Sequence, residues 1–363
     1  MKFSNLVATA SIVGAAVAAP SGHEHKEKRD VLTTTIKAQT TVLVDAVNQA
    51  NVLAVPADVQ TEAAAAPAAT PATQAQAAET TQAASTQKAS SGSSGSSAPA
   101  VDVSASASGV KGVTYSPYNA DGTCKSADQV ASDLSSMTEF PTIRLYGVDC
   151  DQVASVMKAK QANQKVFLGV YFMDQIEQSI STMKSAVEQY GSWNDVVTVS
   201  IGNELVNGGQ ATPSQIGQYV STGRSALQAA GYSGPVVSVD TFIAVINNPE
   251  LCQYSDYMAV NAHAYFDQNT EASDSGKWLL QQIQRVWTAC GGNKDVVIAE
   301  SGWPSKGQTY GIAVPSKENQ QSAVSSIKSA CGASTFLYNA YNDYWKADGN
   351  LGVEKYWGIL SNE

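Results

Sequence analysis

Short apolar runs alternate with helical patterns over most of the chain. Eight runs rich in β-branched and apolar residues predict strands at 113–116, 142–146, 166–171, 196–201, 236–239, 257–260, 296–299 and 335–338. The stretches between them predict helices at 126–137, 150–163, 174–190, 213–230, 277–289 and 317–330. Asp174 and Pro213 are suited to helix starts, and Gly191 and Gly231 stand where C-terminal caps are common.

This alternation is typical of a parallel sheet whose strands are joined by helices. About 255 residues follow position 108, so each of eight repeating units would take about 32 residues, close to the roughly 250-residue (β/α)8 barrel. A doubly wound open sheet is the competing fold, but it usually carries a Gly-rich phosphate-binding turn after its first strand, and TYSPYNADG at 114–122 is no such turn. We therefore expect an α/β fold of the (β/α)8 TIM barrel type over residues 109–363.

The first 108 residues have a different composition. Phe3 is the only aromatic residue before Tyr115, so this region has too little apolar surface to form a packed core. Residues 1–19 resemble a cleaved signal peptide because a short apolar run ends in small residues. A buried N-terminal helix is the alternative, which would need a packed partner that the next 90 or so residues do not offer.

Two segments follow the predicted signal peptide. Residues 20–29 are interpreted as a short pro-segment ending in the dibasic pair Lys28-Arg29, with a solvated charge cluster as the alternative. Residues 30–108 are rich in Ser, Thr, Ala and Gln and predict a disordered spacer that could accept O-linked sugars. We expect a secreted protein.

Charge and cysteine content narrow the range of partners. The net charge of −10 argues against nucleic acid and anionic membranes, and favours a neutral ligand. The C-terminal sequence lacks the hydrophobic tail of a lipid-anchor signal, so no membrane anchor is expected, and we expect a monomer. Five cysteines allow at most two disulfides and leave one thiol, with the pairing open and buried thiols as the alternative. Their spacing suggests no metal site.

Candidate chemistry lies where predicted strands end, because barrels of this type place their active sites there. The fourth strand runs into Asn203 and Glu204, and the seventh into Glu300 and Trp303. The two glutamates are 96 positions apart, which is three repeats of about 32 residues and puts them at the same level of the barrel. Such a carboxyl pair suits glycoside hydrolysis, in which one group protonates the leaving oxygen and the other attacks the anomeric carbon. A structural ion pair is the alternative for either glutamate alone.

At these motifs, IGNE and ESGWPS, the sequence resembles glycoside hydrolase family 17, which contains the plant and fungal β-1,3-glucanases. The resemblance covers residues 109–363. The segments GVTYSPYNADGTCKSADQV, TIRLYGVDC and NDYWKADGNLGVEKYWGIL are most similar to the soluble cell-wall glucanases and surface mannoproteins of yeasts. The resemblance implies a retaining enzyme of the cell wall that acts on β-glucan, with Glu204 as acid/base and Glu300 as nucleophile.

The resemblance also implies residues that bind substrate. Asn203 would bond the sugar 2-hydroxyl, Tyr115 and Arg144 would line the donor subsite, and Trp303 would stack on a pyranose ring. Packing at the barrel rim is the alternative for Trp303.

Two departures from the plant pattern concern the sixth and eighth strands. The run Asn261-Ala-His263-Ala-Tyr265 has His263 where the plant enzymes have tyrosine, and a hydrogen-bonded scaffold role for this histidine is favoured over proton transfer. Asp343 replaces a glutamate, while Lys346 matches. We count His263, Tyr265 and Lys346 among the predicted substrate-binding residues.

The predicted reaction needs no cofactor and no metal. Water as acceptor would make the enzyme a glucanase, or a β-glucosidase if it cut terminal units, and a sugar hydroxyl would make it a wall-remodelling glucanosyltransferase. The sequence does not distinguish water from a sugar hydroxyl as acceptor, and it does not distinguish endo from exo cleavage. The alternative function is a wall mannoprotein with an adhesive or glucan-binding role, which the intact carboxyl pair disfavours.

Overall fold

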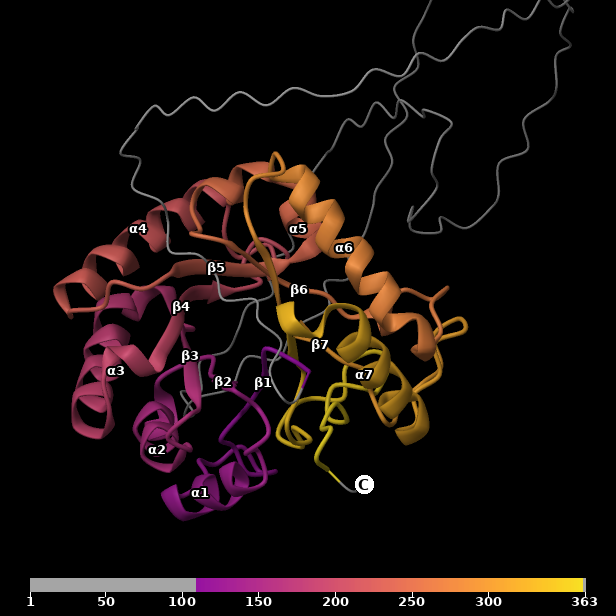
Figure 1. The fold of residues 1–363 in the computed structure, drawn as a ribbon, viewed down its shortest axis with the longest axis horizontal. Coiled ribbons are helices and arrows are strands. Elements are labelled where there is room, and N and C mark those ends of the chain that lie inside the picture. Colours follow the sequence, from indigo (N-terminus) through magenta and orange to yellow (C-terminus); the bar gives the residue numbers. More distant parts are fainter. Residues whose placement is uncertain (1–108, 362–363) are drawn as a thin grey trace, which may run out of the picture. The chain divides into compact units, whose positions relative to one another are not determined.

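The computed structural model describes residues 109–361, which fold into a closed barrel of eight parallel strands surrounded by helices (Figure 1). Each strand pairs with its neighbours in chain order, and β1 closes the barrel against β8. The (β/α)8 prediction is confirmed. The signal peptide, pro-segment and spacer predicted at 1–19, 20–29 and 30–108 lie outside the described residues.

The eight strands fall within a few residues of their predicted positions. They are β1 (Gly112–Thr114), β2 (Thr142–Arg144), β3 (Lys165–Val170), β4 (Val196–Asn203), β5 (Val236–Thr241), β6 (Met258–Asn261), β7 (Val296–Ser301) and β8 (Thr335–Leu337). Strands β4 and β7 run two residues further than predicted, so Asn203 and Glu300 belong to strands and Glu204 follows β4 directly.

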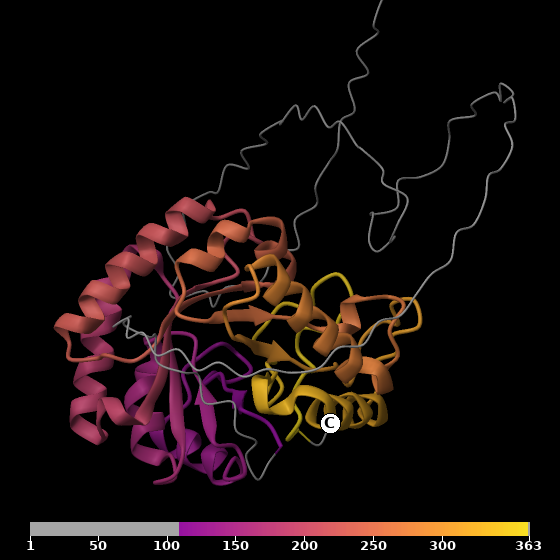
Figure 2. The same cartoon turned by 45° about the horizontal axis from the view of Figure 1, so that its top comes forward.

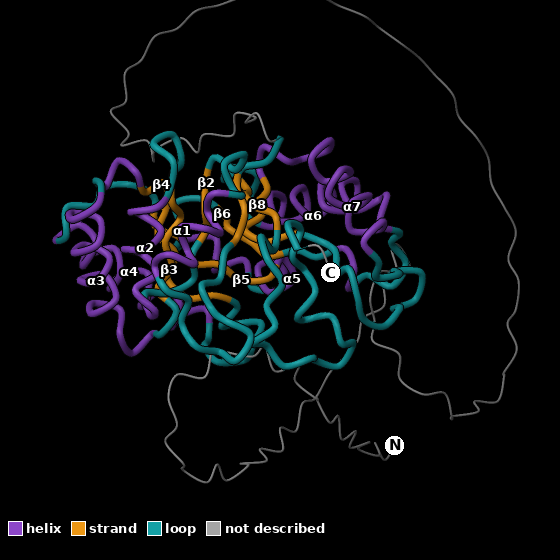
Figure 3. Tube along the Cα trace, turned by 90° about the horizontal axis from the view of Figure 1, so that it is seen from below, coloured by secondary structure: helices purple, strands orange, loops and turns teal. Residues whose placement is uncertain are grey.

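Helices cover the outside of the strands, as Figures 2 and 3 show from two further directions. They are α1 (Ala127–Ser135), α2 (Gln152–Ala159), α3 (Ile176–Tyr190), α4 (Pro213–Ala229), α5 (Phe242–Asn247), α6 (Ser275–Ala289) and α7 (Lys317–Cys331). The α4 start was predicted correctly, because Thr212 and Gln215 form a capping box around Pro213. Helix α5 was missed, since its six residues are too few to show helical periodicity.

Alternation along the strands separates two apolar layers. One layer fills the space between the strands and the helices. The other lies inside the barrel and consists of Phe167, Val237, Val239, Tyr257, Ala259, Val297, Ala299 and Phe336. Because successive residues of a strand point to opposite sides, a shift of one position decides whether a side chain reaches the barrel interior.

Two disulfides fasten the barrel, Cys124–Cys150 and Cys252–Cys290, and Cys331 is free. The expectation of at most two disulfides and one thiol is confirmed. Within residues 109–361 no helix is both long and apolar enough to cross a membrane.

Candidate active site

Glu300 lies at the C-terminal end of β7 and is almost fully buried. The pairing of β6 with β7 shifts register just before Glu300, and such an irregularity re-aims a side chain. Three side chains reach its carboxylate. Arg144 Nη1 lies 3.0 Å and the donating Tyr146 hydroxyl 2.8 Å from Oε1, while His263 Nε2 lies 3.5 Å from Oε2. The Glu300 carboxylate is thus held by the guanidinium of Arg144, the hydroxyl of Tyr146 and the imidazole of His263.

Arg144, the last residue of β2, is itself 1% exposed. It also donates to the carbonyl oxygen of Ala299 at 2.8 Å and, from Nη2, to Asn203 Oδ1 at 2.9 Å. Its guanidinium lies 4.5 Å from the centre of the Tyr146 ring. The charge of Arg144 is therefore fixed between the ends of β4 and β7.

Glu204 reaches the site by an irregular end of β4. The pairing of β4 with β5 shifts register between Ser200 and Asn203, and Gly202 has a left-handed φ of 81°. Glu204 itself has a φ of 55°, in a region that non-glycine residues seldom adopt and that is common at functional sites. Its Oε1 accepts a hydrogen bond from Asn261 Nδ2 at 2.8 Å.

Asn261 joins the surroundings of the two glutamates. Besides Glu204, its amide nitrogen lies 3.3 Å from Asn203 Oδ1, and its Oδ1 accepts from Arg144 at 3.5 Å. One side chain at the end of β6 thus contacts both the acid on β4 and the arginine that pairs with Glu300.

The pKa values of the two carboxyl groups shift in opposite directions. Burial raises the pKa of Glu204 to about 7, with the negative charge of Glu300 adding to the effect. Burial alone would also raise the pKa of Glu300, but the hydrogen bond from His263 and the charge of Arg144 outweigh it and hold that pKa at about 2. Near neutral pH the site can therefore hold one protonated and one ionised carboxyl group.

Lys346 lies on the segment that follows β8. Its ammonium pairs with Asp343 Oδ2 at 2.9 Å and donates to the Tyr338 hydroxyl. Burial would lower the pKa of Lys346, but the charge and hydrogen bond of Asp343 outweigh it and raise that pKa, with a further contribution from Glu300. A fixed ammonium group thus lies within electrostatic range of the nucleophile candidate.

Three of the predicted substrate-binding residues do not have the expected placement. Tyr115 is fully buried and donates its hydroxyl to Asp133 of α1 at 2.7 Å, because it follows the inward-facing Thr114 and so points outward. Trp303 is also fully buried and donates to the Val314 carbonyl at 3.0 Å, which fits rim packing and corrects the predicted stacking role.

Tyr265 is equally buried. Its ring packs edge-on against Trp303, and its hydroxyl donates to the Gln308 carbonyl at 2.6 Å. Its predicted substrate contact is therefore corrected to a packing role. By contrast, Arg144, Asn203 and His263 all lie within the network of the two glutamates.

Tyr146 and Tyr338 were not predicted as site residues, and no role was predicted for Asn261. Tyr146 could have been found from alternation, because it lies two positions after Arg144 and faces the same side. Asn261 lies two positions before His263 and is detectable in the same way. Tyr338, which packs 5.3 Å from His263, follows β8 and carried no such signal. Across residues 109–361, no three His, Cys, Asp or Glu side chains form a group that could hold a metal ion.

Comparison with known proteins gives a consistent picture. Residues 112–358 match the model of the BtgE/BtgC glycoside hydrolase domain. The chain is 72% identical to the probable family 17 glucosidase SCW4 of Saccharomyces cerevisiae over 72% of this chain and 68% of that protein. It is 61% identical to the cell surface mannoprotein MP65 of Candida albicans over 70% of this chain and 67% of that protein.

A solved structure shares the fold. The glycoside hydrolase family 17 β-1,3-glucanosyltransferase from Rhizomucor miehei superposes with a TM-score of 0.59 at 20% identity, covering 69% of this chain and 92% of that chain.

Proposed function

The chain belongs to the BtgE/BtgC glycoside hydrolases of family 17, and from that premise we propose that it is a retaining enzyme acting on β-1,3-glucan. Glu204 is the acid/base and Glu300 the nucleophile. The observation that carries this assignment is the opposite shift of the two pKa values, about 7 for Glu204 and about 2 for Glu300. A pair of carboxyl groups whose environments separate their pKa values is what acid and nucleophile roles require.

In the first step the ionised Glu300 attacks the anomeric carbon while Glu204 gives its proton to the glycosidic oxygen. The bond between that carbon and oxygen breaks, and a covalent glucosyl ester forms on Glu300. Arg144 and Tyr146 keep Glu300 ionised and oriented before the attack, because both hold the same carboxylate oxygen. Asn261 fixes the direction of the Glu204 carboxyl through its hydrogen bond.

In the second step the ionised Glu204 takes the proton of the acceptor hydroxyl as the acceptor oxygen attacks the same carbon. The ester bond to Glu300 breaks and the β configuration is restored. Water gives hydrolysis, and a sugar hydroxyl gives transfer to another glucan chain. The neighbour from Rhizomucor miehei, described as a β-1,3-glucanosyltransferase, makes transfer a reaction to test.

We place the enzyme outside the cell, at the wall. The predicted signal peptide at 1–19 and the relative described as a cell surface mannoprotein support this location. Secretion into culture medium or retention in isolated walls, measured with an antibody against the barrel, tests it.

Azide rescue tests the two catalytic roles. Glu300→Ala removes the nucleophile, so activity should fall by roughly four orders of magnitude, and azide should restore turnover of an activated aryl β-glucoside as the α-glucosyl azide. Glu204→Ala removes the proton donor, so the activated aryl group should still leave, and azide should then give the β-glucosyl azide.

The control is Glu250→Ala, an exposed acid in the turn after α5, which should leave activity unchanged. Anomers the other way round would exchange the roles of the two glutamates. Failure of the wild-type protein to convert β-1,3-linked oligosaccharides would contradict the proposed substrate.

A further inference from the structure

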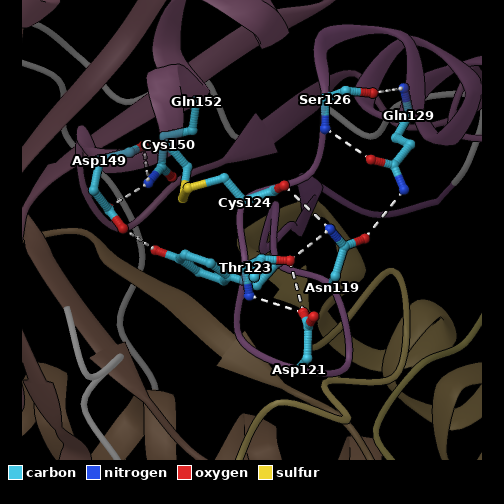
Figure 4. The surroundings of a disulfide bond; sticks show 10 residues. Asn119, Asp121, Thr123, Cys124, Ser126, Gln129, Asp149, Cys150 and Gln152 are labelled. Carbon is cyan, nitrogen blue, oxygen red and sulfur yellow. Dashed lines mark hydrogen bonds between the residues drawn. A yellow bond between two sulfur atoms is a disulfide. The ribbon is translucent and has the colours of Figure 1, made fainter. Parts of the chain in front are cut away.

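Three loops at the C-terminal face of the barrel are fastened to one another outside the carboxyl network. They follow β1, β2 and β8, three strands that are neighbours because β1 pairs with both β2 and β8. The disulfide Cys124–Cys150 joins the loop after β1 to the loop after β2. Figure 4 shows this disulfide beside Asp149 and Gln152.

Tyr118 connects all three loops. It lies in the loop after β1, and its hydroxyl donates to Asp149 Oδ2 in the loop after β2 at 2.7 Å. Its ring packs against Trp345, in the segment after β8, with 4.9 Å between ring centres. The other carboxylate oxygen of Asp149 accepts from Gln152 at 2.8 Å, so the acceptor that holds Tyr118 is itself fixed.

The turn that carries Asp149 depends on support from outside. Cys150 and Asp151 both have left-handed backbones, with φ of 54° and 50°, a conformation that costs energy for residues with a side chain. The disulfide ties this turn to Cys124, which forms an antiparallel bridge with Tyr118. Tyr118 is thus held on one side by its bridge to the disulfide-bonded Cys124 and on the other by the fixed carboxylate of Asp149.

From Trp345 the contacts continue to Lys346, the lysine predicted to bind substrate. The indole nitrogen of Trp345 donates to Asp343 Oδ1 at 3.0 Å, and the other oxygen of Asp343 holds the Lys346 ammonium at 2.9 Å. That ammonium also lies 5.4 Å from the Trp345 ring. Both the aromatic ring and the cation therefore take their positions from groups that Tyr118 contacts directly or through one neighbour.

We propose that Tyr118, braced by the Cys124–Cys150 disulfide, is a positioning residue that sets Trp345 and Lys346 for binding the glucan chain. The proposal rests on the proposed function. Trp345 is only partly buried, so part of its ring can pack against the apolar face of a pyranose, and the Lys346 ammonium can donate to a sugar hydroxyl. Tyr118 itself is not assigned a contact with substrate.

The second disulfide is a matched control. Cys252–Cys290 joins the turn after α5 to the end of α6, on the approach to β6 and β7, and so lies at the opposite end of the barrel from the site. Its sequence separation of 38 is similar to the 26 of Cys124–Cys150, so the two bonds restrict the unfolded chain to a similar extent.

The experiment compares Cys124→Ser/Cys150→Ser with Cys252→Ser/Cys290→Ser on β-1,3-oligosaccharides of increasing length. The first variant should raise KM about tenfold with kcat within about twofold, because uniform binding is lost while the carboxyl pair is untouched. The second should change KM by less than about twofold. Equal changes in KM in both variants would show that Cys124–Cys150 stabilises the fold only in a general way, and would overturn the proposal.

Tyr118→Leu keeps both disulfides, so it tests the proposal even if a cysteine variant does not fold. It should reproduce the rise in KM, whereas Tyr118→Phe, which keeps the ring on Trp345, should raise KM about threefold or less. Adding Tyr118→Leu to the Cys124→Ser/Cys150→Ser variant should have little further effect, since both changes release the same contact.

An unchanged KM in Tyr118→Leu, with an active wild-type enzyme, would refute the positioning role alone. A wild-type enzyme inactive on these sugars would instead refute the proposed function.

Discussion

Strands β4 and β7 each deliver a glutamate to the same face of the barrel but surround it differently. Glu204, after β4, accepts one hydrogen bond from a neutral amide, that of Asn261. Glu300, on β7, is contacted by an arginine, a tyrosine hydroxyl and a histidine. Burial favours the neutral acid at both positions, so the positive charge and hydrogen-bond donors near Glu300 are what separate the pKa values of the proposed proton donor and the proposed nucleophile.

The backbone differs between the two strand ends as well. Glu204 lies two positions after the left-handed Gly202 and is itself left-handed, while the backbone of Glu300 remains in a strand. Backbone strain thus lies at Glu204, the proposed proton donor, whereas Glu300, the proposed nucleophile, keeps an extended backbone although its strand shifts register there.

The largest expected effect comes from removing the charge that distinguishes the two ends. Arg144→Met leaves a buried carboxylate without its cation, which should cost about 3–5 kcal/mol of unfolding free energy and lower kcat about a hundredfold. Urea unfolding and turnover of an aryl β-glucoside measure both. The control is Arg224→Met, which breaks the more exposed pair with Asp256 and should cost less than about 1 kcal/mol. Equal losses in the two variants would mean that Arg144 gives Glu300 no special support.

A smaller effect, of opposite sign at the two ends, is expected in stability against pH. The pKa of Glu204 is raised from 4.5 to about 7, so its contribution to stability is complete below pH 4.5 and is lost as pH rises through about 7. Glu204→Gln should therefore be more stable than the wild-type protein at pH 8, by roughly 2 kcal/mol.

The pKa of Glu300 is lowered from 4.5 to about 2, so its contribution is present above pH 4.5 and is lost as pH falls through about 2. Glu300→Gln should accordingly be less stable than the wild-type protein at pH 8. Denaturant titrations at pH 4.5 and pH 8 decide the matter. Shifts of the same sign in both variants would show that the two environments do not differ as described.

The smallest expected effect is the influence of one carboxyl group on the other. The charge of Glu300 helps to raise the pKa of Glu204, so Glu300→Gln should lower that pKa toward its ordinary value. Carbon NMR of labelled glutamate side chains follows the titration, with Glu250→Gln as the control. In the wild-type enzyme the same group should make kcat/KM fall as pH rises above about 7. A Glu204 titration indifferent to Glu300→Gln would show that the two groups are not coupled.

The amino-acid sequence alone determined the barrel and predicted the candidate catalytic pair. Eight apolar runs at a regular spacing, joined by helical stretches, are compatible with few folds. In a parallel barrel the C-terminal ends of all strands lie on one face. Glu204 and Glu300 could therefore be placed together across 96 positions of sequence. Arg144 and Asn203, which the resemblance named, lie beside them, and so does His263, where the chain departs from the plant pattern.

Only the tertiary structure decided which way the side chains at the strand ends point and which charges meet. Tyr115 and Tyr146 follow neighbouring strands in similar contexts, yet one points outward to Asp133 and the other inward to Glu300, because one position of register turns a side chain to the other face. The pairing of cysteines and the pKa values depend in the same way on distances between groups far apart in the chain. Patterns along a sequence record the period of each element, and contacts between elements arise only when the barrel closes.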